Sequence, residues 1–186
     1  MTIKDIAVCA FKLLGRSDIA VALSAGSELD NESAEKTEAL VYCINAVEDE
    51  LARYYFPAKW TEALRSADGK FYFTDFAHRP VKILAVKSDG KTVDFKEYSK
   101  YIYCGHKSIT VEYEYSPEKR GLEYASAFDG TAVGEGLIAC GAAAEYCVVA
   151  GSVQLAAYWE GRYRRGIELL RGRMRARCVM PPRRWV

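Results

Sequence analysis

Histidine is scarce in this sequence, and the spacings by which histidine and cysteine serve metal sites or catalysis are missing. The 186 residues include two histidines, His78 and His106, and neither belongs to an H-E-x-x-H or comparable metal-binding pattern. Six cysteines are present, but no two form a C-x-x-C pair, and no G-x-S-x-G nucleophile motif occurs. The glycines of DGTAVGEG lack the Lys-Ser/Thr that follows a phosphate-binding loop. We therefore expect no enzyme, no metal and no cofactor. A small enzyme whose site is assembled from scattered residues is the weakest of our alternatives, and a deep pocket with convergent polar groups would favour it.

Long hydrophobic runs are also absent. The most apolar stretch, residues 132–151, contains Glu135 and Glu145, whereas a membrane span needs about 20 predominantly apolar residues. The start of the chain lacks the basic region and cleavage site of a secretory signal. The cysteines fall mostly on apolar faces, as reduced, buried residues do. These features predict a protein kept in a cytoplasm-like environment, with no membrane partner.

Lysine is missing from the last 35 residues, where arginine takes its place. The formal net charge of the whole chain is +1, but residues 152–186 contain nine Arg, no Lys and two Glu, a net charge of +7. The remaining residues therefore carry a net charge of −6. An acidic body with an arginine-rich end is an asymmetry of charge that calls for an explanation.

Hydrophobic spacing divides the chain into helical ends and a strand-rich middle. Apolar residues recur at three- and four-residue steps near residues 3–14, in residues 33–56, and again after Val133. The segment SAGSELDNES and the short apolar run before it read as a connection with one helical turn. Residues 60–116 contain short runs such as KFYFTDF and SITVEYEY, separated by turn sequences such as SDG. The predicted fold class is α+β, a mainly helical core of long antiparallel helices with an inserted small antiparallel β-region.

We expect one domain over residues 1–186 with four parts. Helices occupy residues 1–57, the β-rich insert residues 60–116, further helices residues 133–178, and an extended docking tail residues 179–186. The connection from Ser116 to Thr131 is long enough to be functional, and we expect it to become ordered on assembly. The last helix is expected to bury one stripe, formed by Leu155, Trp159, Tyr163, Ile167, Leu170 and Met174.

The arginine-rich end is the strongest candidate site. Arginine recognises carboxylates and phosphates through its planar, bidentate guanidinium, and Trp and Arg are common interface anchors. A solvated helix face, contact with an acidic protein and contact with nucleic acid are all compatible with the pattern. The candidate partner-binding residues are Arg173, Arg175, Arg177, Arg183, Arg184 and Trp185.

The order of parts resembles a family of known proteins. A first helix ending in Leu-Leu-Gly is followed by a long helix closing on YYFPAKW, an aromatic β-insert, a helix ending AAAEYCVVAGS, and the run VQLAAYWEGRYRRGIELL. This organisation resembles the head-tail connector proteins of tailed bacteriophages, also called adaptor or head-completion proteins, which include the tail tubular protein A type. Residues 144–163 carry the most family-like segment.

The resemblance implies a structural subunit without a reaction or cofactor. Its copies, typically twelve, would form a homo-oligomeric ring beneath the portal protein, assembled in the host cytoplasm and located in the virion at the capsid-tail junction. The C-terminal segment would clamp the portal, tail or tail-completion proteins would bind elsewhere, and DNA would pass through the channel without sequence-specific binding. The alternative from another class is a nucleic-acid-binding protein that uses the arginine-rich C-terminal helix, for which affinity would fall steeply with salt.

Overall fold

The computed structural model describes residues 1–176, with side chains described through Met174. The chain divides into two compact units, one made of residues 1–48 and 119–186 and the other of residues 49–118. We call them the helical unit and the β-rich unit. Helices in the first and small antiparallel sheets in the second confirm the predicted α+β fold class.

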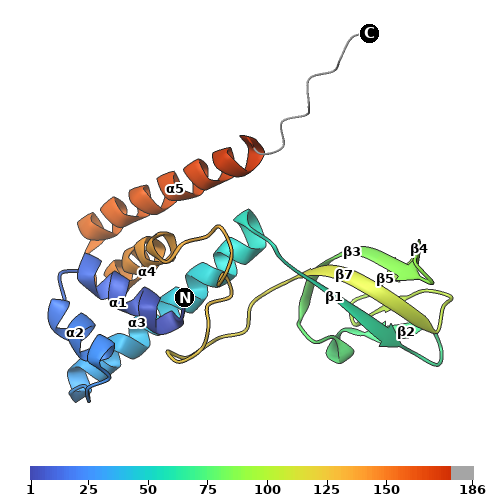
Figure 1. Ribbon diagram of the computed structural model, residues 1–186, viewed down its shortest axis with the longest axis horizontal. Coiled ribbons are helices and arrows are strands. Elements are labelled where there is room, and N and C mark those ends of the chain that lie inside the picture. Colours follow the sequence, from blue (N-terminus) through green and yellow to red (C-terminus); the bar gives the residue numbers. More distant parts are fainter. Residues whose placement is uncertain (177–186) are drawn as a thin grey trace, which may run out of the picture. The chain divides into compact units, whose positions relative to one another are not determined.

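The helical unit is built from five helices drawn from both ends of the sequence (Figure 1). Three come before the β-rich unit and two come after it. They are α1 (Ile3–Leu13), α2 (Ser17–Ala25), α3 (Asn31–Glu50, whose last two residues belong to the β-rich unit), α4 (Glu135–Val149) and α5 (Val153–Ala176).

The first helix begins where its sequence predicts. Thr2 accepts a hydrogen bond from the Asp5 amide, and the Asp5 carboxylate accepts one from the Thr2 amide, which completes a capping box. Its apolar face is fully buried, as Ile3, Ile6 and Phe11 show. The prediction of a single turn in the next segment was wrong, because α2 is a nine-residue helix that buries Ile19 and Leu23.

The second predicted helix is α3, and it continues as a short π-helix, η1 (Leu51–Tyr55). Leu40, Ile44 and Val47 are buried as their spacing predicts. Tyr54 follows Val47 and Leu51 at the same steps of three and four residues but is exposed. The wider i→i+5 turn of a π-helix shifts the phase of the side chains, and a pattern based on 3.6 residues per turn misses that shift.

Small residues allow α4 to lie in the middle of the helical unit. Its buried positions are almost all alanine, glycine and cysteine, and they spread around the helix rather than along one narrow face. A Cβ atom on Gly141 would meet Val47 Cγ1 at 2.9 Å and the Tyr163 ring at 3.0 Å. The apolar spacing after Val133 predicts one face that includes Ala144, Cys147 and Val148, and the first two are buried whereas Val148 is exposed.

The β-rich unit contains seven strands in two antiparallel sheets. One sheet has the order β1-β7-β3-β4, and the other has the order β2-β6-β5. The strands are β1 (Ala58–Arg65), β2 (Lys70–Tyr72), β3 (Pro80–Ser88), β4 (Lys91–Thr92), β5 (Lys96–Glu97), β6 (Tyr101–Tyr103) and β7 (Ser108–Tyr115), with a 3-10 turn, η2 (Phe73–Asp75).

Side chains of both sheets share one apolar core. Phe71 and Ile102 come from the smaller sheet, and Val86, Val111 and Tyr113 come from the larger one. Along β7, Ile109, Val111 and Tyr113 are buried while the residues between them are more exposed, as the alternation in the sequence predicts. This insert therefore has a hydrophobic core of its own.

The segment after the β-rich unit, residues 119–131, is already held in place within the single chain. Asn45 of α3 pairs through its amide with the backbone N–H and carbonyl of Arg120, at 2.7 and 2.9 Å. The buried carboxylate of Glu48 accepts hydrogen bonds from the Ser126 hydroxyl and the Ala127 amide. Further backbone bonds tie this segment to the start of α1. The expectation that these residues become ordered only on assembly was therefore wrong.

Candidate protein-interaction surface

The last helix, α5, carries Arg173 and Arg175 of the candidate residues and buries one stripe in the helical unit. Trp159, Tyr163 and Ile167 are buried, and Ala156 lies on the same side. Trp159 packs against Ala143, Ala144 and Cys147 of α4, where small side chains leave room for the indole ring.

The predicted stripe was correct in its centre and wrong at its ends. Leu155 and Met174 are exposed instead of buried. The 24 residues of α5 span about 36 Å, whereas the 15 residues of α4 span about 22 Å. Because its neighbour is shorter, α5 has ends that its own unit does not fully cover.

A second stripe of α5 faces solvent and was not recognised from the sequence. It consists of Leu155, Tyr158, Arg162, Arg165 and Leu169, which follow one another at steps of three and four residues. We call it the outer stripe. Its apolar members are 54%, 55% and 61% exposed, in chain order. Trp159 and Tyr163 already pack α5 into the helical unit, so Leu155, Tyr158 and Leu169 add nothing to its core. Exposed apolar side chains beside arginines are typical of an interface.

Arg162 is held in position at the centre of the outer stripe. Its guanidinium donates to the Tyr158 hydroxyl at 3.5 Å and lies 5.4 Å from the centroid of the Trp159 ring. The hydrogen bond to Tyr158 raises the already high pKa of Arg162. An arginine side chain is always charged, and these two contacts hold the guanidinium of Arg162 in place.

The structure gives a position to only part of the predicted site. Arg173 is exposed on the last turns of α5. Arg175 lies in α5, but its side chain is outside the described ones, and Arg177, Arg183, Arg184 and Trp185 lie outside the described residues. Among the described residues, neither Arg165 nor Arg173 takes part in an ion pair.

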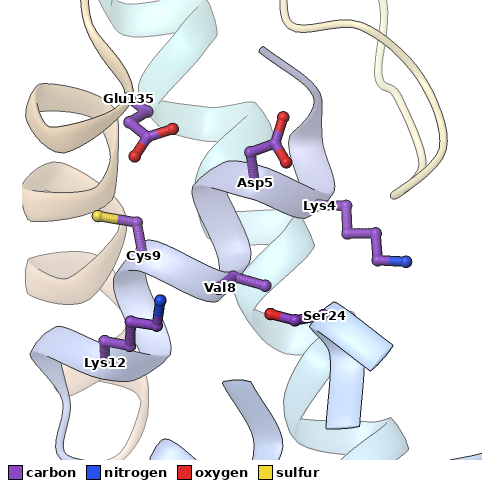
Figure 2. Close-up of a pocket in the computed structure, with 7 residues that line it drawn as sticks. All are labelled: Lys4, Asp5, Val8, Cys9, Lys12, Ser24 and Glu135. Atoms are coloured by element: carbon purple, nitrogen blue, oxygen red, sulfur yellow. The ribbon is translucent and has the colours of Figure 1, made fainter. Parts of the chain in front are cut away.

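One hollow with nucleophilic and acidic side chains lies over α1. It has a volume of about 650 Å³ and is lined by Lys4, Asp5, Val8, Cys9, Lys12, Ser24 and Glu135. In Figure 2 the Cys9 thiol points toward the start of α4, on the side where Glu135 lies. Burial raises the pKa of the Cys9 thiol, and the Glu135 carboxylate raises it further. Because the thiolate is the reactive form, this environment does not activate a nucleophile.

The β-rich unit contains a loose phosphate-loop pattern. Gly90-Lys91-Thr92 follows Ala85 at the spacing of such loops. In the structure Asp89 and Gly90 both have positive φ and form the two-residue turn of the β3–β4 hairpin. A phosphate loop instead leads into a helix whose N-terminus binds the anion, and no helix follows here.

His78 lies among aromatic side chains of the β-rich unit. His78 stacks on Tyr115 at 4.4 Å between ring centroids, and its edge meets Trp60. No group of three or more His, Cys, Asp or Glu side chains in the described residues is arranged to hold a metal ion. All five cysteines among those residues are free thiols. Within the same part of the chain, each helix is too short or too polar to cross a membrane.

Comparison with known proteins identifies no relative. No protein-family model matches the chain, and no curated protein matches its sequence.

Proposed function

We propose that this chain is a structural subunit of a bacteriophage head-tail connector. Its copies form a ring, typically of twelve, that docks onto the portal protein, joins the capsid to the tail and keeps the DNA channel continuous. The subunit performs no reaction. It is assembled in the host cytoplasm and works in the virion at the capsid-tail junction.

The observation that carries the proposal is that α5 has a buried part, which packs in the helical unit, and an exposed cationic end. The first part of the helix anchors itself in the helical unit through Trp159 and Tyr163. The exposed side of the helix then leads through Arg173 into a segment that holds Arg175, Arg177, Arg183, Arg184 and Trp185. A cationic segment that follows a firmly packed helix is suited to holding an acidic surface of another protein.

The fold is compatible with this role. Helices from both ends of the sequence form one unit, and the β-rich unit between them has its own core. In a connector of this kind the helical unit would contact the neighbouring copies, and the β-rich unit would be free to meet tail proteins.

The test is capture of the chain by portal rings of the same virus. We expect portal rings to retain the wild-type chain and to lose a chain that ends before Cys178. The double charge reversal Arg183→Glu with Arg184→Glu should weaken capture by at least about tenfold, because like charges facing each other at an interface are unfavourable. The matched control is Lys59→Glu with Arg65→Glu, which reverses two exposed charges on β1 and should leave capture unchanged.

Two results would contradict the proposal. One is equal capture of the truncated and intact chains. The other is strong DNA binding by the wild type that falls steeply with salt and requires Arg183 and Arg184, which would favour a nucleic-acid-binding protein.

A further inference from the structure

The exposed side of α3 has the same spacing as the outer stripe of α5 but carries the opposite charge. Glu35, Glu38 and Tyr42 are all exposed and follow at steps of three and four residues. We call them the acidic stripe. Neither glutamate takes part in an ion pair or hydrogen bond among the described residues. Tyr42 is 65% exposed, and the Lys119 ammonium lies 5.3 Å from its ring centroid.

The last three residues of the outer stripe have the same spacing as the three residues of the acidic stripe. Two arginines three positions apart occupy the centre of the outer stripe, and two glutamates three positions apart begin the acidic stripe. Four residues beyond each charged pair comes a large exposed side chain, Leu169 on α5 and Tyr42 on α3. Steps of three and four residues are the spacing at which two helices pack along a shared seam. Charges of opposite sign at matching positions set the register and the partner of such a seam.

The helices that carry the two stripes lie on different sides of the helical unit, and the residues of both stripes are exposed. Within the helical unit, α5 lies on one side and the amino-terminal half of α3 on the other, with α1 and α4 between them (Figure 1). A single chain therefore presents a cationic seam on one side and an acidic seam on the other. Association through two different surfaces joins copies head to tail, and it closes into a ring when the rotation between neighbours allows it.

We infer that the outer stripe of α5 docks onto the acidic stripe of α3 in a second copy of this chain. Arg162 and Arg165 pair with Glu35 and Glu38 of the neighbour, while Leu169 or Tyr158 packs against the neighbour's Tyr42. The inference rests on the proposed function in one respect, since it identifies the contact by which the ring would form. It assigns Arg162 and Arg165 to the neighbouring copy and leaves Arg173 and the arginines that follow it for the portal.

Two charge-reversed variants test this contact in solution. The first carries Arg162→Glu and Arg165→Glu, and the second carries Glu35→Arg and Glu38→Arg. We expect the wild-type chain to associate as its concentration rises and to dissociate as salt rises. Each variant alone should associate about 100-fold more weakly, because like charges then face each other across the seam. An equimolar mixture should recover association, since every neighbouring pair can again join opposite charges.

Mass measurement by light scattering and sedimentation, with circular dichroism as a check of folding, gives the readout. The matched control is Arg164→Glu with Arg171→Glu, which reverses two arginines on another face of α5 and should associate as the wild type does. If a reversed variant fails to fold, Arg162→Gln with Arg165→Gln provides the same comparison without new negative charge.

Several outcomes would overturn the inference. The first is a wild-type chain that stays monomeric up to about 1 mM, which is the weak end of specific association. The second is a pair of variants that associate like the wild type. The third is an equimolar mixture that stays monomeric although both variants are folded. DNA binding that requires Arg162 and Arg165, without any change in mass, would assign the outer stripe to nucleic acid instead. The portal test is separate. If the portal captures the chain but the mixture of variants does not recover association, only the contact between α5 and α3 is contradicted. If the mixture recovers association but the portal does not capture the chain, only the connector role is contradicted.

Discussion

Helices α4 and α5 follow one another in the sequence and pack together, yet they meet their surroundings in opposite ways. Small residues around α4 are buried on most sides, so neighbouring helices approach its backbone closely. On α5 one stripe is buried, while Leu155, Tyr158 and Leu169 remain exposed beside arginines. The difference shows that most of α4 serves the packing of the helical unit, whereas the exposed stripe of α5 is left for the partner that we propose. Substitutions should therefore affect stability in the first case and assembly in the second.

The sharpest contrast lies within α5 itself. Replacement of buried Trp159 by alanine should lower the free energy of unfolding of the helical unit by about 3–5 kcal/mol, because a large aromatic side chain leaves a cavity. Leu169→Ala removes an exposed side chain of the same helix and should change the free energy of unfolding by no more than about 0.5 kcal/mol. Urea unfolding followed by circular dichroism measures both. Equal decreases in the free energy of unfolding of the two variants would show that both stripes are buried in the fold to the same degree.

Two glycine-to-alanine substitutions, one in α4 and one in α5, compare how closely each helix is packed at that position. Gly141→Ala places a methyl group 2.9 Å from Val47 Cγ1 and should cost about 1–3 kcal/mol through overpacking. Gly161→Ala lies in α5, where the new methyl group meets nothing within 4 Å, and should stabilise by about 0.5–1 kcal/mol. Thermal unfolding of the two variants should shift in opposite directions. A shared direction would contradict the account of α4 as a closely packed helix.

The smallest expected effect concerns a buried carboxyl on α3. Burial raises the pKa of Glu48 above its ordinary value of 4.5, and the hydrogen bonds from Ser126 and Ala127 offset this only in part. The folded chain therefore holds this proton more tightly than the unfolded chain. The resulting stabilisation is complete below pH 4.5 and is lost as the pH rises through the raised pKa.

Glu48→Gln removes this titration while retaining an oxygen that can accept a hydrogen bond. We expect the free energy of unfolding of the variant, relative to the wild type, to increase as the pH rises from about 4 to about 8. Carboxylates with a lowered pKa, such as Asp5 and Asp129, have the opposite pH dependence, but they are present in both proteins and cancel in the difference. A difference independent of pH would show that the Glu48 carboxyl does not titrate abnormally.

The sequence predicts those structural features that depend on residues close to one another in the chain. The capping box of Thr2 and Asp5 and the alternation along β7 are local patterns, and both are present in the structure. The short helix α2 was missed because its N-cap residue, Arg16, makes no side-chain capping bond. The anchoring of residues 119–131 depends on Asn45 and Glu48, which are more than 70 positions away in the sequence.

The sequence contains a signal for the buried carboxyl of Glu48, but none that singles out the outer stripe of α5. Glu48 follows the buried Ile44 and Val47, and a carboxyl on an apolar stripe indicates a buried polar contact. The outer stripe repeats at the same steps as the buried stripe, and periodicity alone does not tell which of two stripes a neighbouring helix covers. Only the lengths and positions of α4 and α5 separate the two.

The central claim is that this chain acts by assembling with copies of itself and with a portal. Electron microscopy of the wild-type chain mixed with portal rings of the same virus tests it most directly. The account predicts an additional ring of density beneath the portal, made of side-by-side helical units and absent when residues 178–186 are deleted. Portal particles that look the same with and without the chain, at saturating concentration, would contradict it.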